Sequence, residues 1–197
     1  PAADTASNAI RIPKNIRFDT KLDLQKVSYG TIVLNQVKGN LGLYDGIAYL
    51  KGVSMGAAGG TIDASGSYDT REEENARADM KFSLSRLDIP QTAAMFSTIK
   101  ALAPVAASVS GSLDLDARFD AAMQPVYSSI ESKGTLSTQD LKLKNSDFAK
   151  TLGKALGIAA LENDPKVDDL NLSYTISQGK LTIAPTSFRL AGIASTL

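Results

Sequence analysis

The sequence lacks two of the residue types on which enzyme active sites most often depend. Its 197 residues include no cysteine and no histidine. Without cysteine the chain has no disulfide, zinc thiolate or thiol nucleophile, and without histidine it lacks the commonest general base and metal ligand. A Ser-His-Asp or Cys-His site is therefore excluded within this chain, and we expect a protein that is not an enzyme and holds no cofactor or metal.

Net charge, tryptophan and long hydrophobic runs are absent as well. Lys and Arg together number 21, Asp and Glu also number 21, and the net charge is therefore zero. A neutral chain with only 6 % aromatic residues has neither the electrostatic attraction nor the stacking platform of a nucleic-acid binder. No apolar run approaches the ~20 residues that span a bilayer. Because the first residue is not Met, we expect a fragment of a longer chain.

The main pattern that is present is period-2 alternation, which predicts β-strands with one apolar face. Residues 16 to 24 show it clearly, because Ile16, Phe18, Leu22 and Leu24 alternate with charged residues. Residues of the same apolar parity recur along the chain, and we expect them to form one face of a sheet: Ile62, Met80, Phe82, Leu84, Leu113, Leu115, Phe119, Leu170, Leu172 and Ile176. Ordinary core packing is the competing interpretation for each of them.

Glycine-containing turns join the expected strands. Asp45–Gly46 lies between two apolar runs and is the strongest hairpin signal in the chain, since both residues tolerate positive φ. Gln178–Gly179 predicts a second hairpin near the C-terminal end. Gly59–Gly60 predicts a bend before the strand that follows.

Two segments change to helical periodicity. Residues 91–103 follow Asp88, a potential cap, and residues 146–157 begin at Ser146 as N-cap and end at Gly157. We expect these amphipathic helices to pack on the sheet or to cap an apolar groove, through one apolar stripe each: Phe96, Ile99 and Leu102 in the first, and Phe148, Leu152 and Leu156 in the second.

These patterns predict a mainly β (α+β) fold, a curved antiparallel meander of about ten strands with two short helices packed on or capping its concave apolar face. Residues 1–9 are small and polar and predict a linker or tail, and residues 10–197 predict a single domain. The apolar face requires a cover, for which a second sheet, the helices and a ligand are the alternatives.

Few residues suggest chemistry. Asp114, Asp116 and Asp120 resemble a carboxylate cluster, but they also form the polar parity of one strand, which is the interpretation we favour. The glycine-rich residues 56–60 lead into a strand, whereas a phosphate cradle leads into a helix. Two serine–lysine pairs fit a solvated helix face better than a catalytic motif: Ser97 with Lys100, and Ser146 with Lys150.

The order of several motifs resembles the C-terminal region of AsmA-like proteins. IP-x-N-I opens at Ile12, V-x-G-x-L-x-L-x-D-G begins at Val37, and G-G-x-I-x-x-S-G-x-Y-D begins at Gly59. The helical segment leading into LAP and S-G, and the late ISQGKLTIAP, follow in the same order. The likeness covers residues 10–190, each motif is loose, and its specificity lies in the order of the motifs.

The resemblance implies a function in the envelope of Gram-negative bacteria. AsmA/TamB-type proteins are implied to be anchored in the inner membrane by an N-terminal helix, to extend through the periplasm, and to fold as a β-sheet curled into an apolar groove. The implied role is phospholipid transport or outer-membrane lipid homeostasis, with phospholipid or another acyl-chain lipid as ligand and envelope membranes or membrane proteins as partners. The alternative is a scaffold with a filled interior that assists outer-membrane protein assembly.

Overall fold

A single open β-sheet dominates the computed structural model, which describes residues 11–72, 75–95, 105–120, 126–144 and 146–196. Twelve strands, joined by antiparallel pairing, form the sheet, and two short α-helices accompany it in the described chain, in agreement with the predicted mainly β fold. The strands are β1 Arg17–Tyr29, β2 Ile32–Tyr44, β3 Ile47–Ala57, β4 Gly60–Asp69, β5 Ala76–Asp88, β6 Val105–Phe119, β7 Glu131–Leu143, β8 Lys166–Asp168, β9 Asn171–Ser177, β10 Lys180–Ile183, β11 Ser187–Leu190 and β12 Ile193–Thr196.

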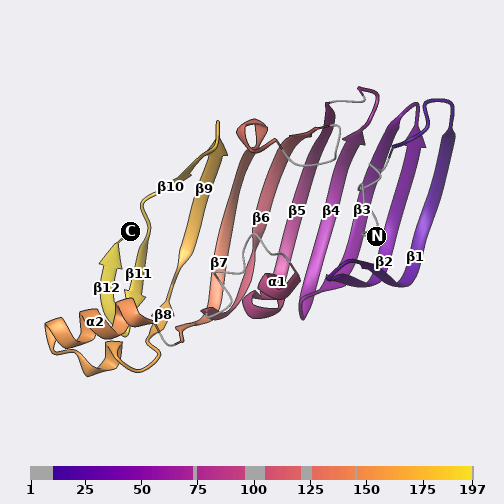
Figure 1. Ribbon diagram of the computed structural model, residues 1–197. Helices are drawn as coiled ribbons and strands as arrows, with labels where there is room; N and C mark the ends of the chain where they lie inside the picture. Colours follow the sequence, from indigo (N-terminus) through magenta and orange to yellow (C-terminus); the bar gives the residue numbers. More distant parts are fainter. Residues whose placement is uncertain (1–10, 73–74, 96–104, 121–125, 145, 197) are drawn as a thin grey trace, which may run out of the picture.

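The strands from β1 to β7 pair in sequence order as a meander (Figure 1). At β7 the sheet branches, because residues 132–137 pair with β9 while Leu141 and Lys142 pair with β8. β10 continues from β9, and β11 and β12 continue from β8. The strand number exceeds the expected ten because β8, β10, β11 and β12 are each only three or four residues long.

Two of the three predicted turns form at the expected residues. Asp45–Gly46 has φ values of 47° and 88°, and Gln178–Gly179 has values of 52° and 73°, so both centres of each turn are left-handed. The bend expected at Gly59–Gly60 lies one residue earlier, at Ala58–Gly59, and Gly60 already begins β4. Alanine is an unfavourable residue for positive φ, and for this reason the sequence pattern pointed to the glycine pair.

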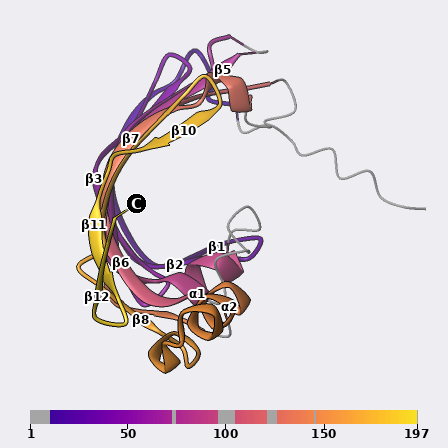
Figure 2. The ribbon, with the colours of Figure 1, turned by 90° about the vertical axis from the view of Figure 1, so that its left-hand side faces the viewer.

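The sheet is strongly curved, and its cross-section is an open C (Figure 2). The backbone of Arg118 identifies the two faces. Its N–H donates to Ser129 Oγ and its C=O accepts from the N–H of Val126, so both groups point away from β5. Figure 1 looks into the concave side, with β6 running upward and β5 to its right. In this orientation the L configuration directs the Arg118 side chain away from the viewer, to the convex face. The neighbouring side chains of Ala117 and Phe119 therefore lie on the concave face.

Cross-strand register extends this assignment to the other strands. Residues opposite each other in an antiparallel ladder share a face, and Leu50, Gly66, Met80 and Leu115 are successive partners on β3 to β6. The apolar residues of the alternating pattern therefore lie on the concave face. Small side chains on this face are the best shielded, and Ala117 is only 2 % exposed.

Glycines on the concave face allow neighbouring strands to approach closely. A Cβ at Gly111 would overlap the carbonyl oxygen of Thr135, and one at Gly134 would overlap that of Ser112. Both glycines lie on the concave side, where curvature crowds the side chains. Their missing side chains therefore permit the curl of β6 against β7.

The two helices lie along the lower margin of the curl (Figure 2). α1 spans Ile89–Met95 and so begins two residues before the predicted segment, whose residues 96–103 lie outside the described residues. α2 spans Asp147–Leu156 with Ser146 as N-cap and a left-handed Gly157 as C-cap, which confirms the predicted boundaries. At this margin Ile89 of α1 packs against a small closed core around Leu141 and Val167, together with Leu143, Leu170, Phe188 and Leu190.

We expect Gly111→Ala to destabilise the protein by about 1–3 kcal/mol, because its methyl group would push β6 away from β7. Gly56→Ala is the matched control, since a Cβ at Gly56 meets its nearest atom, Asn35 O, at an ordinary 3.4 Å. Thermal and urea unfolding of both variants measures the difference. Equal stability of the two variants would show that the concave glycines do not set the strand spacing.

Candidate functional site: an apolar concave face

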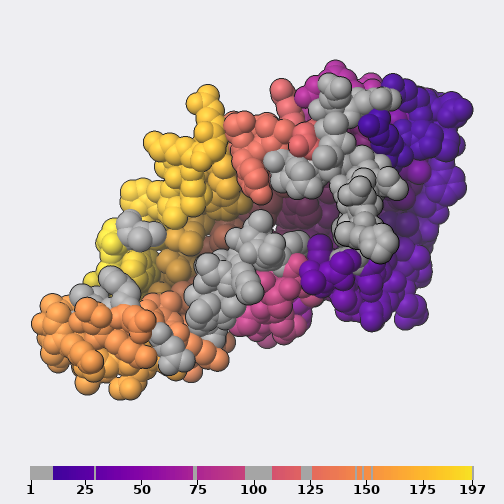
Figure 3. Space-filling model, viewed as in Figure 1, coloured from indigo at the N-terminus to yellow at the C-terminus, as the bar shows by residue number. Residues whose placement is uncertain are grey.

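The concave face is the most extensive apolar surface that the sheet builds. We define the apolar groove as the large apolar and aromatic residues at concave register positions of β1 to β6, β7 and β9: Phe18, Leu22, Leu24, Leu41, Leu43, Leu50, Val53, Met55, Ile62, Tyr68, Met80, Phe82, Leu84, Leu113, Leu115, Phe119, Leu136, Leu172, Tyr174 and Ile176. The space-filling view looks into this side and shows it hollowed (Figure 3).

Charge is segregated to the other side of the sheet. In the described strands, none of the residues whose register places them on the concave face is charged. The convex face instead carries rows such as Lys81, Asp114 and Lys133, which are successive partners on β5, β6 and β7. On the concave face the described strands therefore offer apolar contacts and no charged side chain.

The few polar groups on the concave face are satisfied internally. Ser132 is 8 % exposed, and its hydroxyl donates to the carbonyl oxygen of Asp114 at 2.8 Å. The Tyr174 hydroxyl lies 3.3 Å from the same Ser132 oxygen. Among the described residues, no buried side-chain nitrogen or oxygen lacks a hydrogen-bond partner. The described part of this face therefore offers water few free hydrogen-bonding groups, which favours an apolar occupant.

The groove residues remain partly exposed although they face inward. Met80, Phe82, Leu113 and Leu115 are half-buried in the middle of the sheet. In the described part of the chain the helices lie at the margin, as Figure 2 shows, and they do not cover these strands. A contiguous exposed apolar surface of this kind is typical of a binding site.

The structure brings together most of the residues predicted to line a groove. All of those on β1, β4, β5, β6 and β9 share the concave face, and Ile16 lies immediately before β1. Leu170 differs, because it packs in the closed core at the lower margin. Several groove residues were missed, among them Leu41, Val53 and Met55, because β2 and β3 contain irregular pairing that interrupts strict alternation.

The residues predicted to cap the groove are only partly described. Phe96, Ile99 and Leu102 lie outside the described residues, as do the side chains of Phe148 and Leu152. Leu156 lies at the end of α2 and is 59 % exposed. α2 packs on the short 3-10 helix η3 (Ala159–Leu161) more than on the sheet.

The other chemical candidates have structural roles or lie outside the described chain. Asp116 pairs with Arg77, and Asp114 lies 3.9 Å from Lys133, on the convex face. Ser146 accepts a hydrogen bond from the Ala149 N–H as a helix cap. Ser97 and Lys100 lie outside the described residues, and residues 56–60 span the β3–β4 turn. No group of acidic residues able to hold a metal occurs in the described part of the chain.

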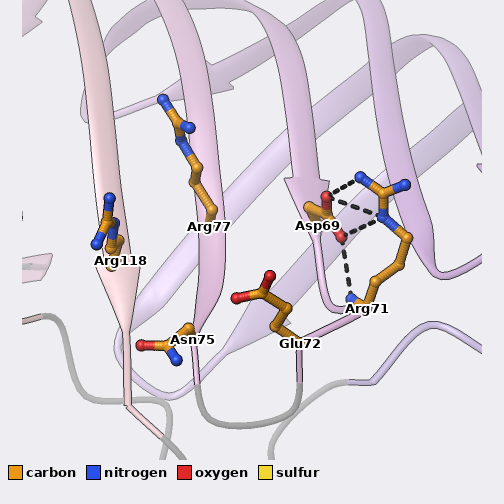
Figure 4. Close-up of a pocket in the computed structure, with 6 residues that line it drawn as sticks. All are labelled: Asp69, Arg71, Glu72, Asn75, Arg77 and Arg118. Carbon is orange, nitrogen blue, oxygen red and sulfur yellow. Dashed lines mark hydrogen bonds and ion pairs between the residues drawn. The ribbon is translucent and has the colours of Figure 1, made fainter.

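A polar pocket of about 650 Å³ lies on the convex side, at the ends of β4, β5 and β6 (Figure 4). Its lining residues are Asp69, Arg71, Glu72, Asn75, Arg77 and Arg118. Arg71 holds Asp69 through its Nε and Nη2 atoms at 2.6–3.1 Å, while Arg77 holds Asp116 of the neighbouring strand. The two lining carboxylates, Asp69 and Glu72, and the neighbouring Asp116 largely compensate the three arginines, so the described residues form no strong anion site here.

Ion pairing shifts the titration of this pocket. Hydrogen bonds from the Arg71 guanidinium lower the pKa of Asp69 below its ordinary value of 3.8, and partial burial opposes them. The same contacts raise the pKa of Arg71, and Asp116 raises the pKa of Arg77. Asp69, Arg71 and Arg77 are therefore charged at neutral pH.

No family model, no curated protein and no solved structure matches the chain. None of the described helices has the length and hydrophobicity needed to cross a membrane. The AsmA-like resemblance therefore stays a prediction.

We expect the Asp69–Arg71 pair to make stability depend on pH. The pKa of Asp69 is lowered on folding, so its contribution is present above the ordinary pKa and is lost as pH falls through the lowered one. Asp69→Asn should reduce the free energy of unfolding by about 0.5 kcal/mol at neutral pH and not in strong acid. Urea titrations at both pH values measure the difference.

Asp63→Asn is the control for this prediction. Asp63 lies on the same face of β4 and forms no ion pair with another described residue, so its replacement should change stability little at either pH. If Asp69→Asn had the same effect in strong acid as at neutral pH, ion pairing of the carboxylate would not be the cause.

Proposed function

We propose that the apolar groove binds the acyl chains of a phospholipid or a related lipid, as a non-enzymatic module of the bacterial cell envelope. One observation carries the proposal: a curled sheet presents apolar residues on its concave face at register positions that hold no charge, and the described helices leave this face open. A half-open apolar channel suits a long, flexible chain better than a compact ligand, which needs polar groups converging on it.

The energetics of acyl-chain transfer support this proposal. Each methylene that leaves water for an apolar surface gains about 0.8 kcal/mol. Binding of this kind discriminates weakly between lipids, because apolar walls respond to shape and length more than to head-group chemistry. We therefore expect a broad preference for acyl chains, with the head group remaining outside the groove.

The likeness to AsmA-like proteins gives the proposal its cellular setting. We propose a periplasmic location, with the full-length protein anchored in the inner membrane by an N-terminal helix, and a role in phospholipid transport or outer-membrane lipid homeostasis. Zero net charge and the absence of histidine and cysteine suit a carrier that performs no covalent chemistry.

A scaffold function is the second candidate, and the closed margin of the sheet favours it. There Ile89 of α1 covers Leu141 and Val167, so the sheet is able to fill part of its own concave side. A protein filled in this way would support outer-membrane assembly through protein contacts. The two candidates differ in whether the central strands accept lipid.

We expect the double variant Met80→Gln/Leu115→Gln to bind labelled phospholipid about tenfold more weakly than the parent chain, since both polar amides enter the groove at paired positions. Fluorescence titration measures the affinity, and lipid extraction with mass spectrometry measures what copurifies. Circular dichroism establishes that the variant is folded.

The matched control is Ser83→Gln/Ser112→Gln. These serines are also direct partners on β5 and β6, but they face the convex side, so phospholipid binding should be unchanged. Absence of bound lipid in the parent protein, together with no binding of labelled phospholipid, would reject the groove and favour the scaffold.

A further inference from the structure

β1 is a long sheet edge with unpaired backbone groups. The C=O of Ile16 accepts a hydrogen bond from the N–H of Asp45, on the side of β2. Because backbone groups alternate in direction along a strand, the N–H and C=O groups of Arg17, Asp19, Lys21 and Asp23 point outward, away from the sheet. In the described chain, β1 pairs only with β2.

This edge has two features that favour edge-to-edge pairing, although it also carries charged side chains, which usually oppose such pairing. The stretch from Arg17 to Leu24 contains no proline, and its register with β2 is unbroken. The opposite end of the sheet is different, because β12 (Ile193–Thr196) is only four residues long. The β1 edge is therefore the site where another strand would add most readily.

The side chains that accompany the outward backbone groups are self-complementary in charge. Arg17, Asp19, Lys21 and Asp23 alternate in sign on the convex face. When two β1 strands run antiparallel about a two-fold axis through Thr20, Arg17 faces Asp23 of the partner subunit, and Asp19 faces Lys21 of the partner subunit. Registers displaced by two residues place like charges opposite each other, which disfavours them.

We propose that two copies of this chain pair through their β1 strands, antiparallel and centred on Thr20, to form a symmetric dimer with one continuous sheet. Four outward-facing residues on each strand supply about eight backbone hydrogen bonds, two for each hydrogen-bonded pair of the ladder. A two-fold axis makes the interface isologous, so the assembly closes at two subunits and does not extend into a fibre.

The concave side gains from the same pairing. Phe18 and Leu24 are 48 % and 44 % exposed, because none of the described strands flanks β1 on its outer side. In the dimer Phe18 lies opposite Leu22 of the partner subunit, and Ile16 lies opposite Leu24 of the partner subunit. The two concave faces then join into one longer apolar face. Dimerisation by this edge holds whether or not the groove binds lipid.

Charge reversal on either side of the axis tests the proposal. Lys21→Glu places two acidic residues opposite each other at two symmetric sites, and Asp19→Lys places two basic residues there. We expect each variant alone to dimerise about tenfold or more weakly than the parent chain. An equimolar mixture of the two variants should restore dimerisation, because every opposed pair is again of opposite sign. Sedimentation equilibrium measures the association constants.

Lys81→Glu is the matched control, since it makes the same change of charge on the convex face of the interior strand β5. It should leave dimerisation unchanged. A parent chain that stays monomeric at high concentration would overturn the proposal, as would a dimer insensitive to both β1 variants. A dimer weakened by only one of the two variants would place the axis away from Thr20 and would likewise overturn this register.

Discussion

Antiparallel pairing that keeps the apolar residues of β3 to β7 on one face is the constraint on which the rest of the structure depends. A strand that slips by one residue exchanges its two faces, so every strand must hold its apolar set in phase with its neighbours. Where the register shifts, the chain inserts a residue with positive φ, as at Gly52 and Arg86. After each insertion the next apolar residue, Val53 or Leu87, returns to the concave side. The bulges therefore preserve the separation of apolar and charged faces.

Curvature follows from how the two faces are filled. Charged side chains on the convex face spread apart and stay hydrated, whereas side chains on the concave face converge. Glycines at Gly111 and Gly134 remove the atoms that would collide there, and small residues such as Ala64 and Ala117 lie between larger neighbours. The curl thus requires small residues at selected concave positions as much as large apolar ones. An all-leucine face would hold the strands too far apart to close into a C.

The sequence predicts this architecture well wherever alternation is unbroken. Residues 76–84 and 109–119 alternate regularly, and their faces match the prediction. Prediction fails at the bulges. There two residues, such as Lys51 and Gly52, lie opposite one on the neighbouring strand, so the alternation of faces shifts by one residue. Such a shift has no strong signature in a single sequence. The register between distant strands, including the branch at β7, depends on non-local pairing that periodicity does not contain. For the same reason a predicted groove residue such as Leu170 could lie in a closed core without any local sign of it.

An open apolar face and an open sheet edge are consequences of one arrangement. A sheet with a single apolar face must cover it, and the described helices cover only its lower margin. Along the groove axis the same face ends at β1, where Phe18 and Leu24 are more exposed than the half-buried groove residues of β5 and β6. A ligand along the groove relieves the exposure of the central strands but leaves the β1 backbone unpaired. A second strand satisfies that backbone and extends the apolar surface, so the two forms of cover complement each other and do not compete for the same atoms.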